Sequence, residues 1–124
     1  MGDLVVYAPD KIAGIVLCRF LKKRDMEPFY YNDEEDFLKK IRFGIAEIII
    51  LDFSSFSSMC EIVRDIENIM IYTQGIPVII ITPYSSNEKE LAHFNNKGYH
   101  IIEKPVCIEH LASLISQLKN RNVK

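Results

Sequence analysis

A run of large aliphatic residues that ends in a carboxylate, Ile48-Ile49-Ile50-Leu51-Asp52, constrains the fold of this chain more than any other stretch. The run is rich in β-branched residues and does not alternate with polar ones, which is typical of a strand buried on both faces. Open α/β sheets bind their ligands at the carboxyl ends of such strands. Asp52 is therefore the first candidate for a functional residue.

Strand-like and helix-like segments alternate five times along the chain. We expect strands at 4–7, 27–31, 47–52, 76–82 and 99–102, and helices at about 11–24, 33–43, 55–72, 85–96 and 106–120. This alternation predicts an α/β fold in which a five-stranded parallel sheet carries helices on both faces. Right-handed crossovers make a doubly wound, flavodoxin-like sheet in the order 2-1-3-4-5 the expected topology. We expect residues 1–124 to form a single domain.

Local signals predict where the helices begin and end and which faces they bury. Asp10 is expected to cap the first helix, and residues 85–88 (Ser-Ser-Asn-Glu) form a capping-box sequence before the fourth. Gly44 and Gly98 are expected to end helices. The residues of the first helix expected to face the core are Ile12, Ile15, Val16, Leu17, Phe20 and Leu21. Those of the third are Phe56, Met59, Cys60, Val63, Ile66 and Met70.

The charge balance argues against two classes of partner. The formal net charge is −2 and the isoelectric point is near 5.9, so neither nucleic acid nor an anionic membrane is the expected partner. The basic cluster at residues 22–24 falls at the end of a predicted helix, where it complements the helix dipole. No apolar run is long enough to span a bilayer.

The cysteines and the amino terminus predict a cytoplasmic location. Cys18, Cys60 and Cys107 are odd in number, form no CxxC pair and fall in largely apolar helical contexts, so we expect buried free thiols in a reducing compartment. Because the chain leads straight into its first predicted strand, we expect no signal peptide. The three histidines are dispersed and show no metal-ligand spacing.

Three polar side chains are expected at one edge of the sheet. Asp52 ends the third strand, Thr82 ends the fourth, and Lys104 follows the fifth, directly before Pro105. The carboxyl ends of parallel strands share one edge, so these residues should lie close together. A carboxylate, a hydroxyl and a cation suit phosphoryl chemistry, as nucleophile, hydrogen-bond donor and charge stabiliser. The simpler alternative is an ion pair between Asp52 and Lys104, because a buried carboxylate needs a partner.

With these residues the chain resembles the receiver domain of two-component response regulators, such as the chemotaxis (CheY-like) response regulator. The spacing of Asp52, Thr82 and Lys104 and the sequence IIEKP at 101–105 carry the resemblance, which covers essentially the whole chain. It implies phosphorelay signal transduction with a phospho-acceptor at Asp52, a switch hydroxyl at Thr82 and a phosphate-binding Lys104. It also implies a cis peptide bond to Pro105 and no enzymatic activity beyond self-phosphorylation and dephosphorylation.

The chain departs from the family's pattern at several positions. The acidic pair after the first strand, which holds Mg²⁺ in the family, is replaced here by Tyr7 and Ala8. Phe56 and Cys60 stand where the family has Pro and Gly, and Ile101 stands at the aromatic switch position. Mg²⁺ favours octahedral sites that include carboxylates, so we expect no cofactor, or only weakly bound Mg²⁺.

The sequence therefore predicts an atypical receiver, or pseudo-receiver, that signals by binding a protein. A kinase, an output protein or a second copy is expected on the face made by the fourth helix, fifth strand and fifth helix, where Tyr99 and Ile101 are candidate contacts. The alternative for this face is that Ile101 packs under the fourth helix and Tyr99 is merely exposed. No output domain is expected within these residues.

Two other functions stay open at this point. One is a conventional phospho-acceptor that is phosphorylated on Asp52 with Mg²⁺. The other is a flavodoxin-like domain that binds a small ligand, for which no Gly-rich phosphate loop follows the first strand.

Overall fold

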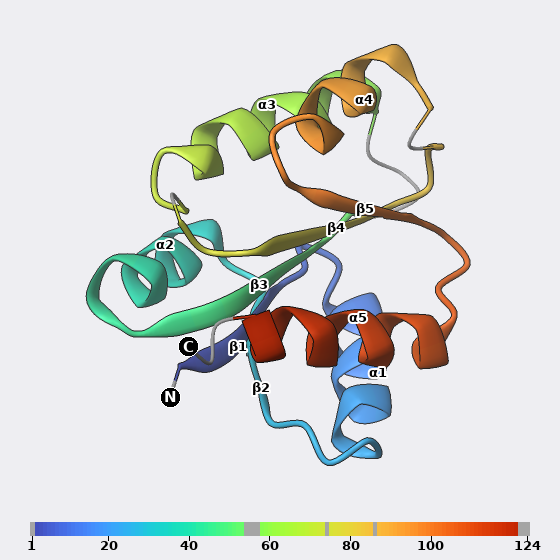
Figure 1. Ribbon diagram of the computed structural model, residues 1–124. Coiled ribbons are helices and arrows are strands. Elements are labelled where there is room, and N and C mark those ends of the chain that lie inside the picture. Colours follow the sequence, from blue (N-terminus) through green and yellow to red (C-terminus); the bar gives the residue numbers. More distant parts are fainter. Residues whose placement is uncertain (1, 54–57, 74, 86, 122–124) are drawn as a thin grey trace.

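The computed structural model describes residues 2–53, 58–73, 75–85 and 87–121. Five parallel strands form one sheet in the order β2-β1-β3-β4-β5, which confirms the predicted topology (Figure 1). The elements are β1 (Asp3–Tyr7), α1 (Lys11–Lys22), β2 (Pro28–Tyr31), α2 (Glu34–Phe43), β3 (Ala46–Asp52), α3 (Met59–Met70), β4 (Val78–Thr82), α4 (Lys89–Asn95), β5 (His100–Glu103) and α5 (Ile108–Arg121). None of the described helices is long and apolar enough to cross a bilayer.

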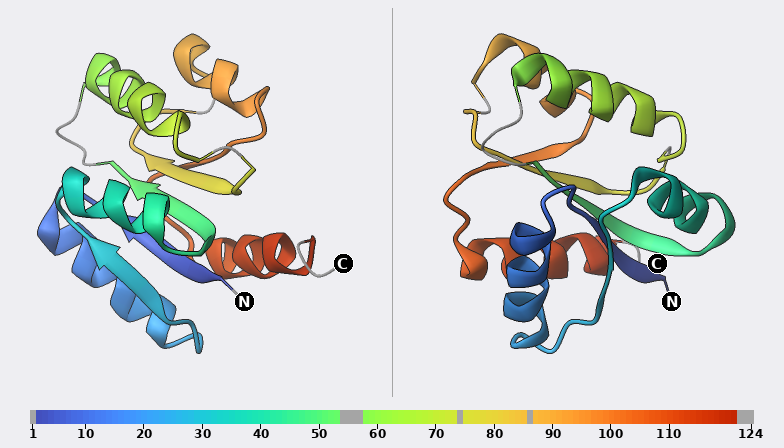
Figure 2. Two further views of the ribbon diagram at one scale, coloured as in Figure 1. Left: turned by 90° about the vertical axis from the view of Figure 1, so that its left-hand side faces the viewer. Right: turned by 180° about the vertical axis from the view of Figure 1, so that it is seen from behind.

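The sheet separates two hydrophobic cores. Helices α1 and α5 cover one face, and α2, α3 and α4 cover the other (Figures 1 and 2). Successive residues of β3 point to opposite faces: Ile48 and Ile50 enter the core under α1 and α5, whereas Ile49 and Leu51 enter the other core. All four side chains are fully buried. The absence of alternation in β3 therefore results from burial on both faces.

The predicted start of α1 and the predicted end of α2 are confirmed. The side chain of Asp10 accepts hydrogen bonds from the backbone N–H groups of Ile12 (3.0 Å) and Ala13 (3.2 Å). Gly44 is the C-cap of α2, and its N–H donates to the carbonyl of Lys40 (2.7 Å). The start of α1 is thus fixed directly after β1, on the edge of the sheet where Asp52 lies.

The predicted capping box before α4 is wrong. Helix α4 begins only at Lys89, after Glu88 as N-cap, and has no side-chain cap bond. The hydroxyl of Ser85 instead accepts from the N–H of Asn87 in the preceding turn (3.1 Å). The observed capping box belongs to α3, where Ser58 and Glu61 bond to each other's backbone N–H groups. Residues 55, 56 and 86, which entered the predictions for these helices, lie outside the described residues.

The predicted inner face of α1 is largely wrong. Ile12 is 76% exposed, and Ile15, Val16 and Phe20 are also exposed. The buried residues are Gly14, Leu17, Cys18 and Leu21. Helix α1 carries two apolar stripes, and periodicity alone does not tell which one faces the sheet.

Two further burial predictions are confirmed only in part. In α3 the predicted Ile66 is fully buried, and Met59, Val63 and Met70 pack at the margin of the core. The centre of the buried stripe is Ile62, Ile66 and Ile69, so it is rotated from the predicted one. Cys18 is buried as expected, but Cys60 and Cys107 are exposed. Cys60 is the second residue of α3, and Cys107 directly precedes α5.

Gly14 faces the core because an aromatic side chain fills the space beside it. A Cβ atom at Gly14 would lie 2.3 Å from Cε1 of the Tyr30 ring. The Tyr30 hydroxyl in turn donates a hydrogen bond to the carbonyl of Ala8 (3.1 Å). The ring therefore cannot give way without losing that bond, and glycine at this position lets α1 approach β2.

We predict that Gly14→Ala destabilises the fold by about 1–2 kcal/mol. Overpacking against Tyr30 costs about 1–3 kcal/mol, which exceeds the gain of up to about 1 kcal/mol in helix propensity. In a Tyr30→Leu background the clashing ring atoms are gone, so the same substitution should be neutral or stabilising. Urea unfolding of the four proteins measures both effects. A destabilisation of equal size in both backgrounds would contradict this explanation of Gly14.

Candidate functional site

The three predicted polar residues lie together at the carboxyl edge of the sheet. Just beyond the strands, the N–H of Phe53 donates to the carbonyl of Ile81 and the N–H of Lys104 donates to the carbonyl of Thr82, both at 2.8 Å. These bonds extend the ladders and hold the ends of β3, β4 and β5 level. Asp52, Thr82 and Lys104 therefore border one site, which we call the Asp52 rim.

Asp52 and Lys104 form a largely buried ion pair. The Nζ atom of Lys104 lies 3.0 Å from Oδ1 of Asp52, and the two side chains are 23% and 6% exposed respectively. The contact is within hydrogen-bonding distance but poorly aligned, so Oδ1 accepts no well-formed hydrogen bond from a described residue. The attraction is therefore mainly electrostatic.

Burial disfavours the charged form of the Asp52 carboxyl group. Burial raises the pKa of Asp52 above the usual value for a carboxyl group, and the charge of Asp10 adds to the rise. The contact with Lys104 lowers the pKa but does not fully offset burial. A proton on Asp52 would relieve the remaining penalty.

Thr82 and the turn after Lys104 complete the rim. Thr82 is fully buried, and its hydroxyl oxygen accepts a hydrogen bond from the N–H of Tyr84 (3.2 Å). The hydroxyl therefore supports the turn after β4, and its hydrogen stays available as a donor. The peptide bond between Lys104 and Pro105 is cis, as the resemblance implied.

Tyr7 is directed into the core and does not cover the rim. Its ring stacks on Phe37 of α2, with centroids 4.8 Å apart and an angle of 16° between the planes. The side chain is part of the core under α2, α3 and α4. Burial, followed by the nearby charge of Glu34, raises the pKa of Tyr7 to about 12. The phenol is therefore neutral and supplies no anionic ligand to the rim.

Ala8 has no polar side chain, and its backbone carbonyl is bound by Tyr30. Ala8 is fully buried and its carbonyl accepts the hydrogen bond from the Tyr30 hydroxyl. Burial raises the pKa of Tyr30, and the charges of Cys18, Asp10 and Asp52 raise it further. Tyr30 is thus a neighbour of the rim that the sequence analysis missed. In the sequence, the only signal for this role of Tyr30 was Gly14, a glycine inside a predicted helix that precedes an aromatic strand.

The described residues do not assemble a metal-binding cluster. No group of three or more His, Cys, Asp or Glu side chains among them is placed to hold a metal ion. Of the two carboxylates near the rim, Asp52 contacts Lys104 and Asp10 caps α1. The donor set therefore does not match the carboxylate-rich octahedral site that Mg²⁺ prefers.

The two candidate contact residues at the β5 edge are partly inside the core. The hydroxyl of Tyr99 lies 3.3 Å from Oγ1 of Thr73, and its ring meets the edge of Phe94 at 6.2 Å between centroids. Ile101 pairs with Ile80 in the sheet and packs against the core under α3 and α4. Both side chains are half-buried, so each presents only part of its surface to a partner.

Solved structures of response regulators share this fold. A CheY-like receiver domain protein from Methanospirillum hungatei is 19% identical, with a TM-score of 0.76 over 98% of this chain and 95% of that chain. A two-component response regulator from Clostridium difficile is 18% identical, with a TM-score of 0.78 over the whole of both chains. The beryllofluoride-activated NtrC4 receiver domain dimer is 21% identical, with a TM-score of 0.77 over 98% of each chain.

These similarities identify the fold as that of CheY-like response regulator receiver domains. A scan against protein-family models finds no match, and a search of curated proteins finds none either. The resemblance stated from the IIEKP sequence and the three rim residues is thus confirmed at the level of the fold.

We predict that Asp52→Asn stabilises the protein at neutral pH, on the order of 1 kcal/mol. Because the folded state raises the pKa of Asp52, it takes up a proton before the unfolded chain does as the pH falls. The wild type therefore gains stability relative to Asp52→Asn as the pH falls toward about 4, the usual carboxyl range. Urea unfolding of both proteins at several pH values measures the difference. A wild type more stable than Asp52→Asn at neutral pH would contradict it.

Lys104→Met provides the matched control. It removes the counter-charge and leaves the buried carboxylate unpaired, so it should cost about 1–3 kcal/mol at neutral pH, discounted for the partial exposure of Lys104. The double variant should be more stable than Lys104→Met alone. Additive effects would mean that the two side chains do not interact.

Proposed function

We propose that this domain signals by binding a protein partner and does so without Mg²⁺-dependent phosphorylation of Asp52. The observation that carries the proposal is the replacement of the acidic pair. Tyr7 is stacked on Phe37 inside the core, and the carbonyl of Ala8 is bound by Tyr30. In this proposal the chain has no catalytic activity of its own.

The metal argument supports the proposal on chemical grounds. Mg²⁺ gives up its water reluctantly and binds where carboxylates repay that cost. Among the described residues, the carboxylates near the rim are Asp52 and Asp10; the Lys104 ammonium group already lies 3.0 Å from Oδ1 of Asp52, and Asp10 caps α1. A dication at the same oxygen would be repelled by that ammonium group. Phosphoryl transfer without a metal lacks the charge stabilisation on which it chiefly depends.

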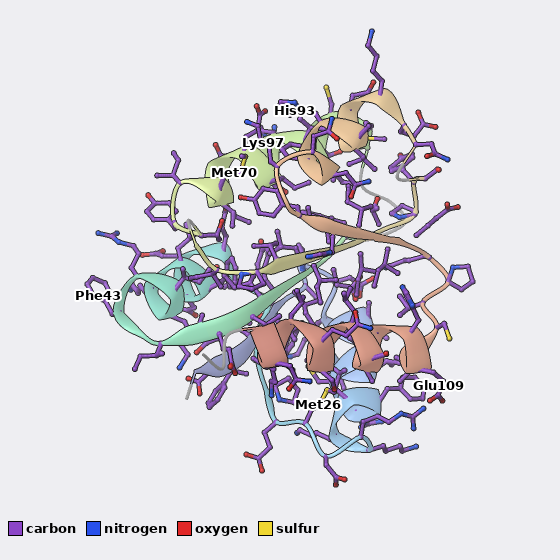
Figure 3. The ribbon with its side chains drawn as sticks, viewed as in Figure 1. Met26, Phe43, Met70, His93, Lys97 and Glu109 are labelled. Atoms are coloured by element: carbon purple, nitrogen blue, oxygen red, sulfur yellow. The ribbon has the colours of Figure 1, made fainter. Side chains whose placement is uncertain are left out.

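A protein partner suits the face at the β5 edge. Lys89 begins helix α4 and Lys97 lies just beyond its end, so cationic groups border this face near α4 (Figure 3 labels Lys97). Glu109, in the first turn of α5, pairs instead with Arg24, which follows α1, and this pair joins α5 to the segment after α1. The half-buried Tyr99 and Ile101 would supply apolar contact, and the charges would set orientation more than affinity. One of the similar solved structures is a receiver domain dimer, so a second copy is one candidate partner.

A conventional phospho-acceptor is the competing function. It is favoured by the rim itself, where Asp52, Thr82 and Lys104 lie together. The two functions differ in whether phosphorylation of Asp52 changes the conformation of the β5 edge. In our proposal that face is preformed, because Ile101 occupies the aromatic switch position and packs in the core.

We predict that beryllofluoride with Mg²⁺ leaves the β5 edge unchanged. The test is an amide NMR spectrum of the ¹⁵N-labelled protein with and without these ions, read at residues 99–103 and 108–120. We expect no saturable shifts there, because the rim lacks the ligands to hold the metal. Shifts that saturate near Asp52 and extend to residues 99–103 would identify a conventional switch and overturn the proposal.

A further inference from the structure

A group of exposed apolar side chains lies at the end of the molecule opposite the Asp52 rim. Phe43 is 79% exposed, Ile45 and Ile71 are each 70% exposed, and Tyr72 is 38% exposed. They belong to the segments where α2 and α3 end, next to the start of β3, on the left of Figure 1. Phe43 points away from the body of the protein (Figure 3).

Arg42 joins the two segments. Its guanidinium carbon lies 5.3 Å from the centroid of the Phe43 ring and 5.7 Å from that of Tyr72. The ends of α2 and α3 are therefore in contact at this position. We call Arg42, Phe43, Ile45, Ile71 and Tyr72 the Arg42 patch.

The guanidinium group of Arg42 is unpaired among the described residues. The neighbouring cations of α2 are not: Lys39 pairs with Glu35, and Lys40 bonds to Asp3 at 2.6 Å. No described residue forms an ion pair or side-chain hydrogen bond with Arg42, so its five N–H donors face solvent between two aromatic rings. A guanidinium group that stacks on the face of an aromatic ring still has its N–H donors free to bind a carboxylate.

Helix stability alone does not account for this arrangement. A cation in the last turn of α2 complements the helix dipole, and Lys40 and Arg42 both do so. That explanation covers the charge but not the large apolar side chains exposed beside it. Single exposed apolar residues are ordinary, whereas adjacent ones from two segments mark interaction surfaces. Aromatic residues and arginine are also the side chains most enriched at the centres of interfaces.

We propose that the Arg42 patch is a second docking surface, which takes a protein segment carrying an apolar side chain beside a carboxylate. The carboxylate binds the N–H donors of Arg42, and the apolar side chain packs on Phe43 and Tyr72. Removal of water by these rings strengthens the charged hydrogen bonds. This surface is separate from the β5 edge, so the domain holds two partners at once.

Charge argues against a second copy as the occupant. A two-fold contact between patches would bring Arg42 opposite the partner's Arg42, and the patch contains no acidic residue to separate them. The acidic residues of α2, at positions 34–36, lie in its first turn, at the far end from Arg42. The complementary charge must therefore come from a different protein.

The test is an NMR titration of the ¹⁵N-labelled protein with a blocked synthetic peptide, Asp-Leu-Asp-Leu-Phe. We expect saturable amide shifts centred on residues 42–45 and 71–72. Arg42→Gln should weaken binding at least about tenfold, as should replacing the peptide's aspartates with asparagine, because both remove charged hydrogen bonds. Lys39→Gln is the matched control, since it removes a cation of the same helix outside the patch, and it should leave binding unchanged.

Four results would overturn the proposal. They are no saturable shifts, shifts centred on another surface, equal binding of the asparagine peptide, and equal weakening by Lys39→Gln and Arg42→Gln. A dilution series without peptide tests whether a second copy of this chain occupies the patch. Concentration-dependent shifts at residues 42–45 and 71–72 would mean that the patch joins two copies of this chain, which also contradicts the proposal.

Discussion

The burial of β3 on both faces is the constraint on which this structure depends. It places the carboxylate of Asp52 at a sheet edge with little access to water, where a charge needs a partner. Lys104, positioned by the bond from its N–H to the carbonyl of Thr82, provides the partner. The other carboxylate near the rim among the described residues, Asp10, caps α1 and adds to the cost of the Asp52 charge.

The chain keeps the receiver fold, and its residues Tyr7 and Ala8 make packing and backbone contacts. Tyr7 contributes to the core through Phe37, and Tyr30 reaches the Ala8 carbonyl through the space that Gly14 leaves. At these positions the side chains stabilise the fold and supply no carboxylate beside Asp52. The two surfaces proposed for protein binding, the β5 edge and the Arg42 patch, lie elsewhere.

The sheet order and the rim residues could be predicted because parallel strands with apolar runs have one buried arrangement and one shared edge. Tyr30 could not be predicted, because it meets Ala8 and Gly14 through contacts between separate elements. The inner face of α1 was missed for a related reason. Both of its stripes are apolar, and the contact with Tyr30 decides which one is buried. The Arg42 patch likewise depends on two helix ends meeting in space.

The central claim is that Asp52 is not a working phospho-acceptor. The most direct measurement is the intact mass of the protein after incubation with acetyl phosphate and Mg²⁺, with Asp52→Asn as the blank. The account predicts no species heavier by one phosphoryl group, in the wild type as in the blank. Such a species in the wild type and not in Asp52→Asn would contradict the account and show that the Asp52 rim retains its phosphoryl chemistry.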